Sequence, residues 1–184
     1  MGCEAKAVIL IDLQRDFFVS SHLAEVREAL LGNVNSLVRR AVELHVPVIN
    51  VRTEHRVDRS TWALNMREDN QGVVLEGTRG AQPLEELLSG TIEVVKTRDS
   101  AFYRTDLADV LDERRITELV LAGVSTEACV SVTAADAYAR DFRVTLAADC
   151  IDSADPDAHE PALSWLNSQY RQPALTHRQV DFQT

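Results

Sequence analysis

Cysteine is scarce in this chain. Only Cys3, Cys129 and Cys150 occur among 184 residues, and no two of them form a CxxC pair. An odd number without paired spacing argues against a disulfide framework and against a zinc site built from thiolates. At least one thiol is therefore expected to be free, and its role depends on where the fold places it.

Long apolar runs and basic clusters are also missing. The longest uncharged apolar stretches have the length of a strand, and the first residues lack the features of a secretory leader. We therefore expect a cytoplasmic protein that does not cross a membrane. The net charge of -10, with no basic block to offset it, repels nucleic acid and anionic lipid, so we expect neither as a partner.

The composition that is present suits a folded core. Hydrophobic residues make up 45% and charged residues 26% of the 184 residues, a length that fits one domain. No linker, repeat or low-complexity tract divides the chain. We expect a single domain over residues 1–184.

Strand-like and helix-like segments alternate along the chain. Short apolar runs predict strands, and apolar residues at helical spacing predict helices. The predicted strands cover residues 7–12, 46–52, 91–96, 118–123, 143–149 and 173–177, and the predicted helices cover residues 23–45, 83–88, 106–114, 128–140 and 155–169. This alternation predicts right-handed crossovers, and hence a doubly wound α/β fold whose mainly parallel sheet has helices on both faces.

Residues 53–83 interrupt the alternation. They are rich in Arg, Asn, Asp and Gly, follow no clear period, and are longer than a compact domain needs for a connection. In open parallel sheets, ligands bind at the carboxyl ends of the strands, near the point where the strand order reverses. We expect residues 53–83 to form a pocket wall there.

Three residues of a chemically coherent set fall at predicted strand ends. Asp12 ends the first strand, Lys96 ends the third, and Cys129 opens the helix after the fourth. Each alone has a structural explanation, as a turn former, a solvated lysine or a buried cysteine. Together they suit nucleophilic catalysis, because a helix N-terminus and an ammonium favour a thiolate, and a carboxylate can shuttle its proton. We expect Cys129 to attack a carbonyl, with Asp12 as base and then acid and Lys96 as electrostatic partner.

The segment GVSTEAC can supply an oxyanion site. The backbone N–H groups of Ser125 and Cys129 lie in a tight predicted loop that enters a helix. Amides in such a loop converge on developing negative charge. We expect these two N–H groups to stabilise the oxyanion that forms when Cys129 attacks.

Three motifs in this order resemble those of the isochorismatase-like cysteine hydrolases. They are VILIDLQRDF at residues 8–17, VVKTRDSAF at residues 94–102 and LVLAGVSTEACVSVTAADAYARDFRVTLAADC at residues 119–150. The resemblance implies a parallel sheet with helices on both faces and an Asp–Lys–Cys set that hydrolyses amide-type C–N bonds through an acyl-enzyme. It also implies a cis peptide between Val124 and Ser125, and assembly into a homo-oligomer.

The resemblance bears on metals and cofactors as well. The nicotinamidase branch binds a metal through an Asp-x-His arrangement and a further His after the second strand, where this chain offers Glu54 and His55. One His and one Glu make a poor site for a divalent metal, so we expect no catalytic metal and no cofactor. True isochorismatases lack the cysteine, so Cys129 argues against vinyl-ether cleavage.

A small-molecule substrate is expected to contact side chains from the motifs and from residues 53–83. These candidates are Gln14, Phe17, Trp62, Asn65, Phe102, Tyr103 and Thr126. An aromatic ring and an amide suit the orientation of a small ligand. Trp62 and Leu64 are equally explained as anchors of a long loop, and Phe17 and Phe102 as core residues.

Other polar residues have plainer explanations. The basic group at positions 52, 55, 56 and 59 either binds a carboxylated substrate or is a solvated loop or subunit contact. Cys150 ends an apolar strand and is expected to pack. His159 and His177 are expected to be structural or exposed.

The favoured hypothesis is a metal-free cysteine amidohydrolase that acts on a small amide. Two alternatives stay open: a hydrolase of another activated bond, such as a lactam of a secondary metabolite or a vinyl ether, and a non-catalytic binding module on the same fold. A nucleotide-binding module is disfavoured, because no GxGxxG or GxxxxGK[ST] motif follows the first strand.

Overall fold

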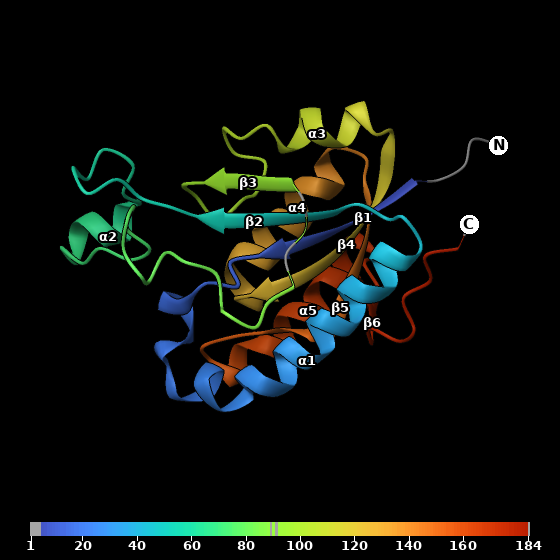
Figure 1. Cartoon of the computed structure of the whole chain (residues 1–184), viewed down its shortest axis with the longest axis horizontal. Coiled ribbons are helices and arrows are strands. Elements are labelled where there is room, and N and C mark those ends of the chain that lie inside the picture. Colours follow the sequence, from blue (N-terminus) through green and yellow to red (C-terminus); the bar gives the residue numbers. More distant parts are fainter. Residues whose placement is uncertain (1–4, 89, 91, 184) are drawn as a thin grey trace.

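Six parallel strands form one sheet in the order β3-β2-β1-β4-β5-β6 (Figure 1). The computed structural model describes residues 5–88, 90 and 92–183. The strands are β1 (Ala5–Ile11), β2 (Val48–Thr53), β3 (Ile92–Lys96), β4 (Ile116–Val124), β5 (Arg143–Asp152) and β6 (Ala174–Leu175). The helices and helical turns are η1 (Arg15–Val19), α1 (Ser21–Glu43), α2 (Leu64–Glu68), α3 (Leu107–Glu113), η2 (Thr126–Val130), α4 (Ser131–Ala139) and α5 (Pro156–Tyr170). The predicted doubly wound α/β fold is confirmed.

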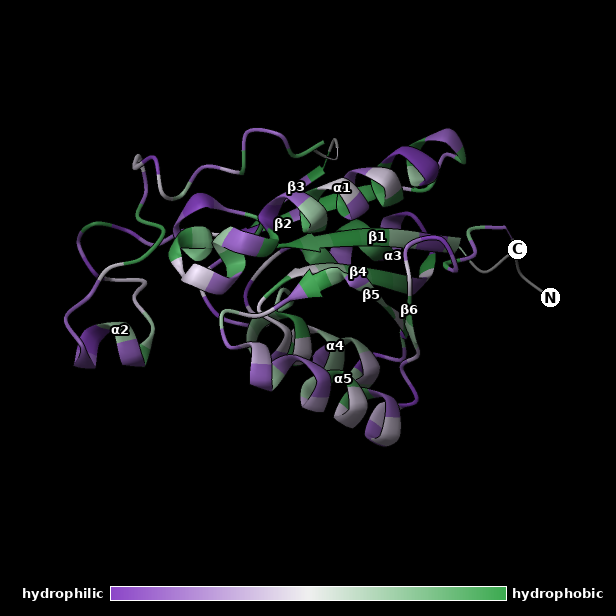
Figure 2. Ribbon diagram, turned by 90° about the horizontal axis from the view of Figure 1, so that it is seen from below, coloured by the Kyte–Doolittle hydropathy of each residue, from purple (hydrophilic) through white to green (hydrophobic). Residues whose placement is uncertain are grey.

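Two hydrophobic cores lie on opposite faces of the sheet. In β1, Ala7, Ile9 and Ile11 pack in the core that α3, α4 and α5 cover, whereas Val8 and Leu10 pack in the core that α1 covers. Figure 2 shows α1 on one side of the sheet and α4 and α5 on the other. Because both faces of the sheet are buried, β1 is apolar at successive positions and does not alternate with polar residues.

The strand order reverses between β1 and β4. From β1 the chain winds outward through β2 to β3, and after α3 it resumes on the other side of β1 with β4. The carboxyl ends of β1 and β4 therefore flank the switch point at which open α/β sheets bind ligands. In Figure 1 the strand arrows point toward the side on which α2 and its flanking loops lie.

Gly123 allows β4 to approach β1 closely at this edge. Its φ is +126°, and a Cβ atom added there would lie 2.0 Å from the backbone oxygen of Ile11. Only glycine combines this backbone conformation with so short an approach. The residue thus fixes the distance between the strand that precedes Asp12 and the strand that leads to Cys129.

The helix predicted at residues 83–88 is wrong, because this stretch forms a turn. Its neighbourhood pairs instead with the chain after β1: the Arg15 N–H donates to the Gln82 carbonyl, and the Leu84 N–H donates to the Leu13 carbonyl. Pro83 also forms an antiparallel bridge with Gln14, so the start of this stretch is extended and does not begin a helix. The apolar spacing that predicted a helix reflects packing of this stretch on the α1 side of the sheet.

The remaining predicted elements are present, with shifted ends. The strand predicted at 91–96 is β3, and residue 91 lies outside the described residues. β5 runs three residues beyond its predicted end, because after a register shift its last residues pair with Gly123 and Val124 of β4. The short helix α2 falls inside residues 53–83, where no helix was predicted. None of the described helices has the length and apolar character needed to cross a membrane.

Candidate active site

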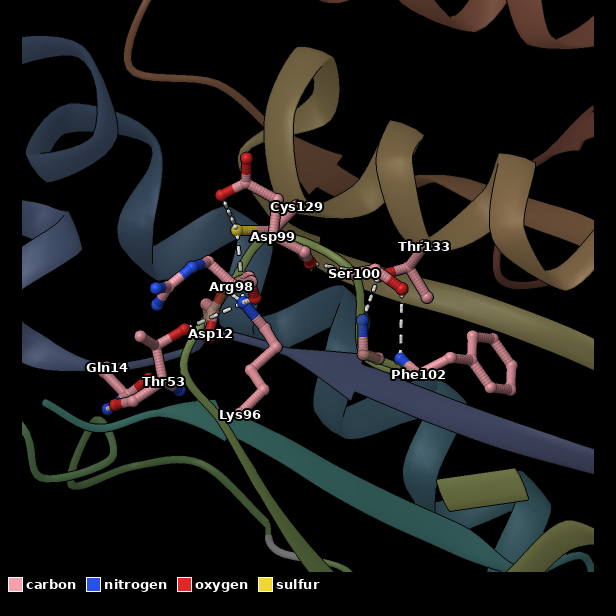
Figure 3. A network of polar contacts seen from close by, with 11 residues as sticks. Asp12, Gln14, Thr53, Lys96, Arg98, Asp99, Ser100, Phe102, Cys129 and Thr133 are labelled. Atoms are coloured by element: carbon pink, nitrogen blue, oxygen red, sulfur yellow. Dashed lines mark hydrogen bonds and ion pairs between the residues drawn. The ribbon is translucent and has the colours of Figure 1, made fainter. Parts of the chain in front are cut away.

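Asp12, Lys96 and Cys129 meet at the carboxyl edge of the sheet (Figure 3). The Lys96 Nζ atom lies 2.7 Å from Asp12 Oδ2 and donates a hydrogen bond of 3.2 Å to Cys129 Sγ. The side chains of Asp12 and Lys96 are fully buried, so their attraction is screened less than that of a surface pair. The structure thus brings the three predicted residues into one contact network.

Thr53, which no motif marked, joins the buried ion pair. Its hydroxyl donates to Asp12 Oδ1 at 2.8 Å and accepts from the Lys96 ammonium at 2.8 Å. Lys96 also donates to the carbonyl oxygen of Arg98 at 3.1 Å. In the sequence, only its position at the end of a predicted strand could have indicated that Thr53 belongs to the site. Thr53 ends β2, and β2 lies between β1 and β3 in the sheet.

Local backbone geometry places both Asp12 and Cys129 in contact with the Lys96 ammonium. Asp12 adopts φ +53°, a left-handed conformation that Asp tolerates better than most residues, and its N–H donates to the Val51 carbonyl at 2.9 Å. The predicted cis peptide between Val124 and Ser125 is confirmed. The turn η2 then curls around Ser125, whose carbonyl accepts from residues 128 and 130. Cys129 therefore lies inside a π-helical turn, a feature frequent at functional sites, and precedes α4.

Burial and the neighbouring charges shift the pKa of the Cys129 thiol in opposite directions. Burial raises the pKa of Cys129 most, the Asp12 carboxylate raises it further, and the Lys96 ammonium lowers it, with the net result well above its ordinary value. Burial lowers the pKa of Lys96, but attraction to Asp12 and Cys129 outweighs this and leaves it raised. The raised pKa argues against the expected stabilised thiolate, because burial and the Asp12 carboxylate outweigh the Lys96 ammonium.

Cys129 opens onto a cavity of about 160 Å³. Residues 53–83 supply much of its wall, as expected, through His55, Ala63, Asn65, Met66, Val73 and Val74. Phe17, Arg98 and Asp99 contribute other parts of the lining. The volume is below the range typical of drug-sized ligands, so the cavity suits a small molecule. A larger groove of about 950 Å³ lies at the amino ends of β4 and β5, remote from Cys129.

Two of the seven predicted substrate-binding residues, Phe17 and Asn65, line this cavity. Trp62 is buried, and its indole N–H donates to a backbone carbonyl at 3.0 Å, which favours its interpretation as a loop anchor. Phe102 is buried in the core and stacks on Phe142, and in Figure 3 its ring points away from Cys129.

The other three predicted binding residues lie outside the cavity lining. Tyr103 is exposed, with a guanidinium group above its ring. Thr126 is fully buried, and its hydroxyl contacts His159 Nδ1 at 2.8 Å, which gives that half-buried histidine a structural partner. Gln14 is buried, and its amide bonds to the backbone of Thr53 and Ala81 at 2.8 to 2.9 Å.

Gln14 and Asp16 fasten the cavity wall to the end of β1. The Gln14 amide bonds link β1 to the start and the end of residues 53–83. The Asp16 carboxylate accepts from the Val74 N–H at 2.8 Å and lies so close to Gly80 that a Cβ atom there would clash with it. These two residues position the wall and do not contact the sulfur.

The basic group at positions 52, 55, 56 and 59 does not form an anion site at the cavity. Arg52 is ion-paired with Glu54 and Glu93 at the surface, and Arg56 is ion-paired with a neighbouring aspartate. His55 does line the cavity, and burial lowers its pKa most, so its ring is neutral at pH 7. The cationic side chain in the cavity lining is Arg98, which the sequence did not single out.

A family model, the Isochorismatase domain, matches residues 6–179 of this sequence. The chain belongs to the isochorismatase family. Its sequence is 34% identical over 163 residues to a probable inactive nicotinamidase of Arabidopsis thaliana, and the matched region covers 83% of each chain. A solved nicotinamidase/pyrazinamidase of Bacillus subtilis matches with a TM-score of 0.81 and 29% identity, over 93% of this chain and 99% of that one. A solved pyrazinamidase of Pyrococcus horikoshii in complex with zinc matches with a TM-score of 0.80 and 26% identity, over 93% and 98%.

The zinc complex prompts the question of whether this isochorismatase-family chain offers comparable ligands. Beside the cavity, Glu54 is held in an ion pair at 2.7 Å and His55 Nδ1 contacts a backbone carbonyl at 2.9 Å. Within residues 5–88, 90 and 92–183, a group of three potential ligands occurs once, as Asp149, Cys150 and His177, and Cys150 belongs to the core on the α1 side. The residues beside Cys129 therefore do not fit a divalent metal.

Proposed function

We propose that this protein is a metal-free cysteine hydrolase that cleaves a C–N amide bond of a small molecule. The observation that carries the proposal is the position of Lys96 Nζ, which lies 2.7 Å from Asp12 Oδ2 and 3.2 Å from Cys129 Sγ beside a cavity. An ammonium that contacts both a carboxylate and a thiol holds a base beside a nucleophile. The similarity to nicotinamidases supports amide chemistry, and we propose that residues 1–184 act as one domain.

Attack begins from the neutral thiol. Asp12 takes the Cys129 proton while the sulfur forms a bond to the amide carbonyl carbon, so no resting thiolate is required. The carbonyl electron pair moves onto oxygen, and the N–H groups of Ser125 and Cys129 stabilise this oxyanion. Lys96 keeps its charge throughout and offsets the negative charge that passes from Asp12 to the reacting atoms.

Collapse of the tetrahedral intermediate breaks the C–N bond. Asp12 returns its proton to the leaving nitrogen, which departs as ammonia or an amine and leaves a thioester on Cys129. Water then attacks the thioester carbon, with Asp12 accepting one of its protons. When the C–S bond breaks, that proton returns to sulfur, the acid leaves, and the resting thiol is restored.

A panel of small amides tests this function by ammonia or amine release. Cys129→Ala should reduce release to the rate without enzyme, because the nucleophile is gone. Cys150→Ala is the matched control, since Cys150 is fully buried on the α1 side of the sheet, and it should keep activity. Equal turnover in wild type and Cys129→Ala would exclude Cys129 as the nucleophile.

One comparison favours a second candidate, a non-catalytic binding module. The sequence is 34% identical to a relative named as a probable inactive nicotinamidase. Ligand-induced stabilisation on melting, without product from any amide, lactam or vinyl ether, would support it. Acid formed without amine release would instead indicate an activated bond other than an acyclic amide. We also propose assembly into a homo-oligomer, which sedimentation analysis tests.

A further inference from the structure

Asp99 places an exposed carboxylate beside the nucleophile. The Cys129 thiol contacts Asp99 Oδ1 at 3.7 Å, and Asp99 lines the same cavity as Cys129. Figure 3 shows the sulfur between the Asp99 carboxylate on one side and the Lys96 ammonium on the other. Asp12 is fully buried beneath this arrangement, whereas Asp99 is open to solvent. An arriving substrate therefore meets Asp99 before it meets Asp12.

The loop that carries Asp99 is fixed on both sides. The preceding residue, Arg98, accepts a hydrogen bond from Lys96 through its carbonyl at 3.1 Å. The following residue, Ser100, donates its hydroxyl hydrogen to Asp136 of α4 at 2.5 Å. Anchors on both neighbours hold the Asp99 backbone in place beside Cys129.

The other charges near the sulfur are compensated or directed elsewhere. Asp12 and Lys96 neutralise each other, and His55 is neutral at pH 7. The Arg98 guanidinium donates to backbone carbonyl oxygens, including that of Thr61 at 2.7 Å. In the part of the chain that the structure describes, no ion pair involves Asp99. Asp99 is the acidic side chain in the lining of this cavity, so its removal changes the charge that a substrate meets there.

We propose that Asp99 is a specificity-determining residue that selects amides with a cationic or hydrogen-bond-donating group at the cavity entrance and rejects those with a carboxylate there. This specificity rests on the proposed function, which identifies the cleaved bond as an amide. The charge preference itself is a property of the cavity and is measurable without turnover.

Two methanethiosulfonate reagents of similar size measure this preference directly. Both convert Cys129 to a mixed disulfide with release of methanesulfinate; one carries a trimethylammonium group and the other a sulfonate. The ratio of their rates, followed by site-resolved mass spectrometry, cancels the thiolate fraction. A unit charge about 6 Å from a carboxylate in water-like surroundings changes each rate about threefold, so Asp99→Asn should lower the cation-to-anion ratio about tenfold at low salt.

Asp112→Asn is the matched control, because it removes an exposed carboxylate from the far end of α3. The ratio should be unchanged in this control, and the effect of Asp99→Asn should shrink in 0.5 M salt. An unchanged ratio in Asp99→Asn overturns the proposal. A shifted ratio without hydrolysis of any amide supports the charge preference and counts against the proposed function. Where hydrolysis is found, Asp99→Asn should raise kcat/KM for a carboxylate-bearing amide relative to a neutral one, and failure to do so overturns the assigned specificity.

Discussion

Replacing Asp12 by Asn should change thiol reactivity and turnover in opposite directions. Burial raises the pKa of Cys129 most, and the Asp12 carboxylate adds to this effect. Removing that negative charge should therefore lower the thiol pKa and increase the thiolate fraction at pH 7. The same variant lacks the proposed base, so its hydrolysis of a confirmed amide should fall by about 10² to 10⁴-fold.

The magnitude follows from the geometry around Lys96. Its Nζ atom lies 2.7 Å from Asp12 Oδ2 and 3.2 Å from Cys129 Sγ, which limits the separation of the two anionic atoms. Like charges about 6 Å apart repel by about 3 kcal/mol at an effective dielectric constant of about 20, which is about a hundredfold in thiolate fraction. Because a less basic thiolate is a weaker nucleophile, the alkylation rate should rise by about tenfold.

Alkylation by iodoacetamide at pH 7, resolved by site with mass spectrometry, measures this change. Asp112→Asn controls for the loss of a carboxylate, and the buried Cys150 should stay unlabelled in every folded variant. Asp12→Asn leaves the buried Lys96 without its anionic partner, which is expected to destabilise the protein. Melting curves therefore serve to check that the variant is folded. Labelling of Cys129 at or below the wild-type rate would show that the Asp12 carboxylate does not raise the pKa of the thiol. Turnover close to wild type would refute the role of Asp12 as base.

Three further variants test how the fold supports the site. Gly123→Ala should abolish stable folding, because φ is +126° and a Cβ atom would lie 2.0 Å from a β1 carbonyl oxygen. Gly32→Ala, in an open position of α1, should instead raise the free energy of unfolding in urea by about 1 kcal/mol. A well-folded Gly123→Ala protein would contradict this. Gln14→Leu should lower the free energy of unfolding by about 2 to 4 kcal/mol, because the buried backbone groups of Thr53 and Ala81 lose their hydrogen-bond partners. The variant should also speed limited proteolysis within residues 53–83. Unchanged proteolysis would show that the wall is held by other contacts. Burial raises the pKa of the Cys150 thiol, so its stabilising contribution is present below about pH 9 and is lost as the pH rises further. The melting temperature of Cys150→Ala should therefore decline less steeply between pH 8 and pH 11, and an identical slope would count against a buried, protonated thiol.

The parallel sheet and the meeting of Asp12, Lys96 and Cys129 were predictable because they follow from local pattern and one topological rule. Apolar runs such as β1 mark buried strands, and the carboxyl ends of parallel strands share one edge. Any polar residue placed directly after such strands must lie at that edge. Thr53 satisfied the same rule and was missed, since a threonine at a strand end has no distinctive pattern.

The cavity wall and the ionisation of Cys129 were not predictable, because both depend on distant contacts. Residues 53–83 are shaped by bonds to Gln14 and Asp16, at separations of 39 to 67 residues along the chain. The turn at 83–88 replaces a helix because its backbone pairs with the chain after β1. Position at a helix start predicted a thiolate for Cys129, whereas burial and the Asp12 charge, both tertiary properties, raise its pKa.

Covalent trapping can show directly whether Cys129 carries an acyl group during turnover. A hydrolysed amide from the panel is mixed with the enzyme, quenched in acid within milliseconds to seconds, and digested for site-resolved mass spectrometry. If Cys129 is the nucleophile, we expect the mass of the acyl group on the peptide that contains Cys129, its absence in Cys129→Ala, and one oxygen from labelled water in the released acid. Turnover without any adduct on Cys129, or with the acyl group on another residue, would contradict a cysteine acyl-enzyme.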